Sequence, residues 1–280
     1  MKENCINEKG VVAIRDTSKD DEKVVVIETL STRVMAPKVV YKYRDYSNEF
    51  HRRLLSHQEL YLASPLSFED VHDCSLEYEV PAKRELFDFY RRHLPAKLLN
   101  APRHEQRRYA KMMAKEGLLT NPEEERKVQR KIDERHFLRF GVLSLSKKYD
   151  IDYMWERYGN NHKGFCVGFD TKTLCNSGLF GGGGDVVYYD ELPFLHVDDN
   201  VDERIAKSIF SKLRIPYEQE QEYRLTKSWQ HEATDADRTK VVPPDSIVSI
   251  VLGRDMEEGV KNEIKEIQAN LYGAASLTEL

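Results

Sequence analysis

Short apolar segments separated by helical patterns constrain the fold of this 280-residue chain more than any other feature. Each segment is rich in β-branched and aromatic residues and is too short for a typical helix of a globular protein. The segment nearest the C-terminus, SIVSIVLG, is apolar almost throughout, which indicates a strand buried on both faces. The segments are VVYKYR (39–44), GVLSLS (141–146), KGFCVGFD (163–170) and SIVSIVLG (246–253).

Three more strand-like runs and several helices complete the pattern. The runs are ELYLASP (59–65), DVVYY (185–189) and the segment around EQEYRL (220–225). Helical spacing predicts short helices over 47–58, 150–159 and 201–213, and a closing helix with Asp255 as its N-cap and Glu258 at capping-box spacing. We therefore expect an α+β protein with a mixed or antiparallel central sheet of about six or seven strands.

The domain organisation follows from where these patterns begin and stop. Residues 1–37 form an N-terminal extension with one strand-like run, KVVVIE, and their partial disorder is left open. Residues 38–280 are expected to form a single α+β domain. Residues 82–140 are expected to form a helical insertion within it, broken at Pro95 and Pro102. The run GGGG (181–184) predicts a flexible connector, because neither nucleotide-binding glycine motif is present.

Charge is distributed unevenly between the insertion and the remaining chain. Residues 82–140 hold 16 Lys and Arg against 9 Asp and Glu, whereas the net charge of the whole chain is −5. Basic residues there alternate with aromatic residues, a pattern most typical of a solvated helix face over a small core. A local positive excess also attracts polyanions, so nucleic acid or a protein acceptor is the partner that this segment predicts.

Several classes of protein are disfavoured by the sequence. No window approaches 18 consecutive apolar residues, so we expect no membrane span, and the start MKENCINEKG lacks the apolar core of a secretory signal. We therefore expect a cytoplasmic protein with reduced cysteines. The cysteines form no CxxC pair and no histidine cluster accompanies them, so no metal is expected. Sequence signatures of serine, cysteine and zinc hydrolases are missing.

One acidic cluster keeps a metal-dependent alternative open. Four carboxylates follow ELYLASP closely: Asp70, Asp73, Glu77 and Glu79. Carboxylates of this kind hold Mg²⁺ in nucleases. No lysine follows the last acid at the spacing that a restriction-type nuclease core uses. A solvated acidic loop is therefore the favoured interpretation of this cluster.

Five polar residues spread along the chain carry the strongest indication of chemistry. Arg44 ends the first strand of the domain, Ser144 and Ser146 lie in GVLSLS, and Glu220 and Glu222 lie in EQEYRL. Cleavage of a dinucleotide such as NAD needs a donor for the pyrophosphate, a hydroxyl that orients a carboxylate, and a glutamate that stabilises the developing ribose cation. Two glutamates one residue apart on a strand would share a face.

An aromatic pair could complete such a pocket. Trp155 and Tyr158 are three residues apart on one short predicted helix, and we expect them to form the floor of the NAD site. The competing interpretation is that Glu220, Glu222 and Arg224 form cross-strand ion pairs on a solvated sheet face.

The segments that carry these residues resemble a bacterial family called domain of unknown function 2971. The resemblance covers about residues 39–253 and is most specific in MWERYGNNHKGFCVGFD (154–170); the other matching segments are YKYRDY, ELYLASPLSFED, GVLSLS and EQEYRL. The chain has Glu69 where the family usually has asparagine and Val71 where it has proline. The family name implies no established activity.

A second resemblance, to the ADP-ribosyltransferase superfamily, is carried by the order of arginine, serine pair and glutamate pair. Leucine stands between the two serines of this chain. The resemblance implies that Arg44 binds NAD, that Ser144 or Ser146 takes the serine role, that Glu222 is the catalytic glutamate and that Glu220 acts on the acceptor.

These observations lead to one expected function and two alternatives. We expect a cytoplasmic enzyme that uses NAD as its substrate and transfers ADP-ribose to a macromolecule, in bacterial stress or phage defence. A non-catalytic nucleic-acid-binding module built on 82–140 is one alternative. A metal-dependent nuclease built on Asp70, Asp73 and Glu77 is the other. The acceptor and the oligomeric state stay open.

Overall fold

A computed structural model of the chain describes residues 11–15, 24–28, 36–70, 72–79, 81–116, 122–196 and 199–280. Within these ranges the central feature is one sheet of seven strands with helices packed around it. The only parallel neighbours in it are the last two strands of the chain, so the sheet is mixed. The predicted α+β class with a mixed central sheet is therefore confirmed.

The order of strands across the sheet brings distant segments together. Its edge-to-edge order is β13 (Ser276–Glu279), β12 (Ile247–Leu252), β6 (Phe165–Asp170), β3 (Val39–Arg44), β5 (Phe140–Ser146), β10 (Glu222–Ser228) and β7 (Gly182–Asp185). The three strands that carry the predicted arginine, serines and Glu222 are β3, β5 and β10, which are neighbours. The strand order therefore places those residues close together in the sheet.

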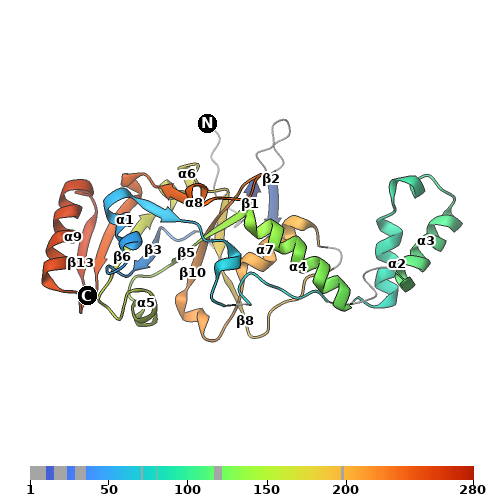
Figure 1. Cartoon of the computed structure of the whole chain (residues 1–280), viewed down its shortest axis with the longest axis horizontal. Coiled ribbons are helices and arrows are strands. Elements are labelled where there is room, and N and C mark those ends of the chain that lie inside the picture. The colour runs from blue at the N-terminus through green and yellow to red at the C-terminus, as the bar shows by residue number, and fades with distance from the viewer. Residues whose placement is uncertain are drawn as a thin grey trace.

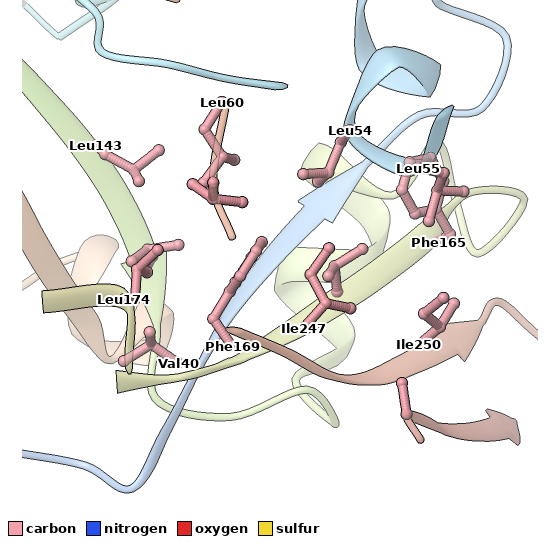
Figure 2. Packing of buried hydrophobic residues seen from close by; sticks show 14 of the residues in the cluster. Val40, Leu54, Leu55, Leu60, Leu143, Phe165, Phe169, Leu174, Ile247 and Ile250 are labelled. Carbon is pink, nitrogen blue, oxygen red and sulfur yellow. The ribbon is translucent and has the colours of Figure 1, made fainter. Parts of the chain in front are cut away.

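Alternation along β5 and β10 separates an apolar face from a polar one. Leu143, Leu145 and Leu225 point into the main core, where each is at most 2% exposed. Helix α1 (Glu49–His57) adds Leu54 and Leu55 to the same core (Figure 2). Helix α9 (Glu258–Leu271) adds Ile264. Full burial of one such side chain contributes roughly 1.5–3 kcal/mol. This core fixes the orientation of the polar face opposite, which carries Ser144 and Ser146 of β5 and Glu222 of β10.

The glycine run has a different structure from the expected flexible connector. Gly182–Asp185 form edge strand β7, which pairs antiparallel with β10. A Cβ at Gly183 would lie 2.5 Å from Leu225 and 2.8 Å from the carbonyl of Arg224, so only glycine fits this close approach. The expected strand 185–189 is divided between β7 and β8 (Val187–Tyr189), and β8 pairs with β9 (Ser211–Leu213).

Other predicted elements need smaller corrections. ELYLASP contributes the short strand β4 (Glu59–Tyr61), which pairs with β11 (Thr239–Val241) outside the main sheet, and a single bridge from Ala63 to Val142 of β5. The helix expected over 201–213 ends earlier, as α7 (Val201–Phe210), because β9 begins at Ser211. The closing helix starts at Glu258 with Glu257 as N-cap and no side-chain cap, so the predicted capping box at Asp255 is wrong. Helices α6 (Thr171–Asn176) and α8 (Asp235–Arg238) were not predicted.

The helical insertion consists of two parts with different surroundings. Helices α2 (Lys83–Arg92) and α3 (Arg103–Glu116) form a hairpin with its own small core of Leu86, Tyr90, Ala110 and Ala114. Helix α4 (Pro122–Leu138) instead contacts β5 and the 3₁₀ turn Pro65–Ser67. Figure 1 shows the α2–α3 hairpin at one end of the long axis, away from the sheet, with α9 at the other end.

The turn between α5 (Asp152–Tyr158) and β6 has an unusual backbone. Asn160, Asn161 and His162 follow one another with φ of 49°, 51° and 63°, which is the left-handed region. Three such residues in succession are uncommon outside glycine. The turn leads into Gly164, where a Cβ would lie 2.1 Å from the carbonyl oxygen of Arg44. This close approach brings the start of β6 directly against the end of β3.

Two strands are described within the predicted N-terminal extension, 1–37. β1 (Val11–Arg15) pairs antiparallel with β2 (Val24–Glu28), so the strand-like run at KVVVIE is paired. Most of the other residues of the extension lie outside the described ranges. The partial disorder considered for residues 1–37 concerns those residues and stays open. Among the described helices, none is both long enough and apolar enough to cross a membrane.

Candidate functional site

A cleft opens where strands β3 and β5 separate. The two strands pair at Tyr41 and Ser146 only, and the cleft is lined beyond this point by Lys42 and Arg44 from one strand and Ser144 from the other. Its volume is about 680 Å³, within the usual range for small-molecule sites. Because β10 is the next strand after β5, its first residue, Glu222, also reaches the cleft.

Six of the seven residues predicted for the NAD site line this one cleft. They are Arg44, Ser144, Ser146, Tyr158, Glu220 and Glu222. They come from three adjacent strands, from the end of α5, and from the 3₁₀ turn Tyr217–Glu220. The structure therefore brings together residues that lie as much as 178 positions apart in the chain.

Trp155 is the predicted residue that the structure places elsewhere. Its side chain is 1% exposed and contacts Tyr43 edge-on at 5.1 Å between ring centroids. The ring of His162 stacks on the indole, with 5.8 Å between the ring centroids. The indole Nε1 donates to the carbonyl of Tyr149 at 2.7 Å, which satisfies its one polar group. Trp155 belongs to the core beneath α5, so only Tyr158 of the aromatic pair reaches the cleft.

Lys212 connects the carboxylates at one side of the cleft. Its Nζ lies 2.7 Å from Glu220 Oε2, 3.0 Å from Glu222 Oε2 and 3.5 Å from Asp73 Oδ2. The lysine comes from β9, and 7% of its side chain is exposed. Tyr217 covers the ammonium group with its ring, 4.6 Å from Nζ to the centroid. One buried cation therefore holds three carboxylates in a fixed arrangement.

Arg224 lies behind this arrangement and is completely buried. Its Nε donates to Glu222 Oε1 at 2.7 Å, and its Nη2 donates to Glu222 Oε2 at 2.9 Å and to Asp73 Oδ2 at 2.8 Å. Arg224 and Glu222 are two residues apart on β10 and so share a face. The predicted ion pair between them exists, but it is buried and does not lie on a solvated sheet face as that interpretation required.

The protonation state of Glu222 follows from these neighbours. Burial alone would raise the pKa of its carboxyl group, but the charges of Arg224 and Lys212 and the hydroxyl of Ser144 lower it well below its usual range. The same carboxylates raise the pKa of Lys212 against the effect of its own burial. Glu222 is therefore a permanent anion at neutral pH. The five charges of the cluster sum to one excess negative charge, because Asp73, Glu220 and Glu222 face two cations.

Glu220 reaches the cluster by a route different from the predicted one. The sequence indicated that both glutamates would share one strand face, but Glu220 ends the 3₁₀ turn and Gln221 is left-handed with φ of 45°. Strand β10 begins only at Glu222. The hydroxyl of Tyr158 donates to Glu220 Oε1 at 3.1 Å, and Ser146 Oγ donates to the backbone carbonyl of Glu220 at 2.8 Å. Tyr158 is 38% exposed and forms the outer wall beside this carboxylate.

The β3 side of the cleft is cationic. Among the described residues, the guanidinium of Arg44 has no ion pair and no hydrogen-bond partner, and burial lowers its pKa to about 10. Lys42 Nζ donates to the carbonyl of Ser144 at 2.7 Å, and burial followed by the charge of Arg44 lowers the pKa of this lysine well below its usual range. Burial and the same arginine lower the pKa of His51 to about 4.

The residues of the metal-dependent alternative do not form a metal centre. In the described part of the chain, no group of three or more His, Cys, Asp or Glu side chains is arranged to hold a metal ion. Asp73 is already paired with Arg224 and Lys212, whereas Glu77 is exposed and Glu79 pairs with His196 at 2.6 Å. The acidic cluster of the sequence is thus divided between the buried cluster and the surface.

Sequence reasoning missed several residues of the cleft, among them Lys42, His51 and Lys212. Lys42 could have been suspected, because it lies two residues before Arg44 on the same strand and therefore on the same face. Lys212 gives no such signal, because β9 is a three-residue strand and its partner β8 lies outside the main sheet.

One segment of the chain, which supplies residues to one side of this cleft, matches a known family. The family described as protein of unknown function DUF2971 matches residues 154–233. This segment of the chain is similar to that family. The match confirms the first of the two resemblances seen in the sequence. No curated protein and no solved structure matches the chain.

The DUF2971 segment contains two of the three carboxylates of the buried cluster and both of its cations, whereas Asp73 lies before it. Tyr158, Lys212, Glu220, Glu222 and Arg224 all lie within residues 154–233. Arg44, Ser144 and Ser146 lie before the match, on strands β3 and β5. The cationic side of the cleft is thus supplied by the chain outside the matched DUF2971 segment.

Proposed function

We propose that the cleft binds NAD, cleaves its bond between ribose and nicotinamide, and transfers ADP-ribose to a macromolecular acceptor in the cytoplasm. The observation that carries this proposal is that Arg44, Ser144, Glu220 and Glu222 line one cleft with cations on one side and carboxylates on the other. NAD has the matching polarity, because its pyrophosphate is anionic and its nicotinamide ring is cationic.

Each side of the cleft has a separate role in this proposal. Arg44, with no partner among the described residues, binds the pyrophosphate, and the neutral His51 beside it offers a hydrogen-bonding ring nitrogen. The ribose lies against Glu222 and Glu220, whose cluster has one excess negative charge. That charge stabilises the positive charge that develops on the ribose as the bond to nicotinamide breaks.

The atoms and electrons of the reaction balance without any further reagent. The electron pair of the broken C–N bond leaves with the nicotinamide nitrogen, which becomes neutral. A nucleophilic group of the acceptor forms the new bond at the ribose carbon and releases its proton to the solvent. Glu220 contacts Lys212 and Tyr158 at the wall of the cleft, and in this proposal it positions the acceptor. The acceptor is a nucleic acid or a protein.

The test is nicotinamide release from NAD by the purified full chain, alone and with RNA, DNA or cell lysate. The Glu222→Gln variant should lose at least about 100-fold in rate, as removal of an electrostatic stabiliser typically does. The matched control is Glu232→Gln, because Glu232 is exposed and lies outside the cleft. Melting temperature and far-UV circular dichroism are measured on both variants, since Glu222 is also an ion-pair partner of the buried Arg224.

A second variant keeps the test decisive if Glu222→Gln fails to fold. Tyr158→Phe removes one hydroxyl group from the partly exposed wall of the cleft and keeps the ring. We expect it to fold and to reduce nicotinamide release at least about threefold. Release of nicotinamide at the wild-type rate by well-folded Glu222→Gln protein would overturn the proposal, as would no release by the wild type under every condition.

A further inference from the structure

The net positive charge of the helical insertion lies almost entirely on the α2–α3 hairpin. Residues 81–116 contain ten Lys and Arg against four Asp and Glu, whereas residues 122–138, which form α4, contain five of each. The boundary between the two counts is the boundary between the projecting hairpin and the helix that packs on the sheet (Figure 1). The basic region of the sequence is therefore one structural unit with its own core.

One face of α3 carries a regular row of these cations. Arg103, Arg107, Lys111 and Lys115 follow one another at intervals of four residues, and all four are exposed. At 1.5 Å per residue the row extends about 18 Å along the helix, enough to face several successive phosphates of a nucleic acid. We call these four residues the cation row.

The cation row has few counter-ions of its own. Within the described residues, Arg103, Arg107 and Lys111 have no ion-pair partner, and Lys115 reaches only its neighbour Glu116, at 3.5 Å. Like charges at four-residue spacing repel one another on a helix surface. The hairpin retains this repulsion, whereas α4 has equal numbers of basic and acidic residues. An external polyanion would relieve the repulsion on the hairpin.

A hollow beside the cation row adds an apolar feature to the charged one. Phe87 of α2 and Ala114 of α3 line it together with Lys111 and Lys115, and its volume is about 290 Å³. Phe87 is partly exposed and packs against the hairpin core from this side. An aromatic ring flanked by two lysines is what a stacked nucleobase and its neighbouring phosphates require. Anionic lipid headgroups have no flat ring that would occupy it, and an acidic peptide supplies one only where it carries an aromatic side chain.

We propose that the α2–α3 hairpin binds single-stranded nucleic acid, with the phosphates along the cation row and one base against Phe87. Single strands fit better than duplexes, because their bases are free to stack on a protein side chain. The binding is independent of NAD cleavage, since the hairpin contributes no residue to the cleft between β3 and β5.

The first experiment measures binding of a fluorescent single-stranded oligonucleotide of about 20 nucleotides to the full chain by anisotropy. Four phosphate contacts predict that raising the salt from about 50 to about 200 mM weakens binding roughly 50-fold. The double variant Arg107→Glu/Lys111→Glu should bind at least about tenfold more weakly. The matched control Arg130→Glu/Lys131→Glu reverses two exposed charges on α4 and should bind like the wild type.

The second experiment separates stacking from charge. Phe87→Leu keeps an apolar side chain in the hairpin core and removes the aromatic face, and we expect about fivefold weaker binding of the single strand. Heparin and vesicles containing phosphatidylserine serve as polyanions without bases. Equal affinity for heparin with no effect of Phe87→Leu would overturn the assignment, and so would stronger binding to vesicles or to duplex DNA.

The nucleic-acid and NAD proposals fail separately. Glu222→Gln protein that is folded should bind the oligonucleotide like the wild type, because the cleft lies outside the hairpin. Loss of binding in the α4 control to the same extent as in the cation-row variant would locate the nucleic acid elsewhere. Absence of binding near 50 mM salt would overturn the hairpin proposal and leave NAD cleavage untouched.

Discussion

The same residue types behave differently at the cleft and on the α2–α3 hairpin. At the cleft, Lys212 and Arg224 are buried and held between three carboxylates. On the hairpin, Arg107 and Lys111 are exposed, with no ion pair among the described residues. Buried charges require partners, because an unpaired ion in a low-dielectric interior is strongly destabilised. Exposed charges are hydrated and contribute little to folding. Cations in this chain therefore stabilise the fold at the cleft and are available to an external partner on the hairpin.

The largest expected effect comes from removing the buried arginine. Arg224→Met leaves Glu222 and Asp73 short of a partner, so the free energy of unfolding should fall by about 3–5 kcal/mol. Arg108→Met on the hairpin should change it by no more than about 0.5 kcal/mol. Urea unfolding followed by circular dichroism measures both values. Similar small losses in the two variants would remove the contrast between the regions.

A core substitution in the hairpin should act only locally. Leu86→Ala opens a cavity in a cluster of four buried residues, and the local stability of the hairpin should fall by about 2 kcal/mol. Amide hydrogen exchange should then accelerate in α2 and α3 and stay unchanged in β5 and β10. The control, Leu143→Ala in the main core, should accelerate exchange throughout the sheet. Acceleration in β5 caused by Leu86→Ala would show that the two regions unfold together.

Acidification should destabilise the region of the cleft through His51. The pKa of His51 is about 4 in the folded chain, against 6.5 ordinarily, so the unfolded chain binds the extra proton first. Stability should decrease as the pH falls from about 6.5 to about 4. The decrease should be smaller in His51→Gln by an amount on the order of 1 kcal/mol, since this ring is only partly buried and solvent screens it. Thermal melts across this pH range measure the difference, and identical pH profiles would contradict it.

The smallest effect belongs to a surface pair on the hairpin. Glu116→Gln removes the carboxylate 3.5 Å from Lys115, and both side chains are largely exposed. The free energy of unfolding should change by less than about 0.5 kcal/mol. Oligonucleotide binding should strengthen slightly, because the change adds one unit of net positive charge beside the cation row. A loss above 1 kcal/mol would show that the hairpin depends on its charges as the cleft does.

Local patterns predicted the elements of the sheet, and the reason is visible in particular strands. SIVSIVLG is apolar because β12 has strands on both sides and core on its face, so its burial is encoded in its own residues. The glycine run was misinterpreted because β7 depends on the close approach of β10 at Gly183, a contact with a segment 42 positions away. Sequence windows carry no information about such a partner.

The candidate site was predictable in part for the same reason. Ser144 and Ser146, like Glu222 and Arg224, alternate along strands, so their shared face follows from spacing alone. Glu220 was placed on a strand because its neighbours continue the pattern, but the left-handed Gln221 separates it from β10. Lys212 contacts three carboxylates only through tertiary folding. Trp155 was given to the cleft because helical spacing relates it to Tyr158, whereas core packing decided its position.

The left-handed turn at Asn160, Asn161 and His162 determines what similarity to the segment 154–170 implies about another chain. Those residues lie in MWERYGNNHKGFCVGFD, and their types suit a backbone that most side chains resist. Gly164 follows because nothing larger fits against Arg44. A chain that shares this block therefore inherits a shape, and with it the placement of β6 against β3, without inheriting any particular activity. Transfer of function between such chains should be judged on their counterparts of Arg44, Lys212 and Glu222.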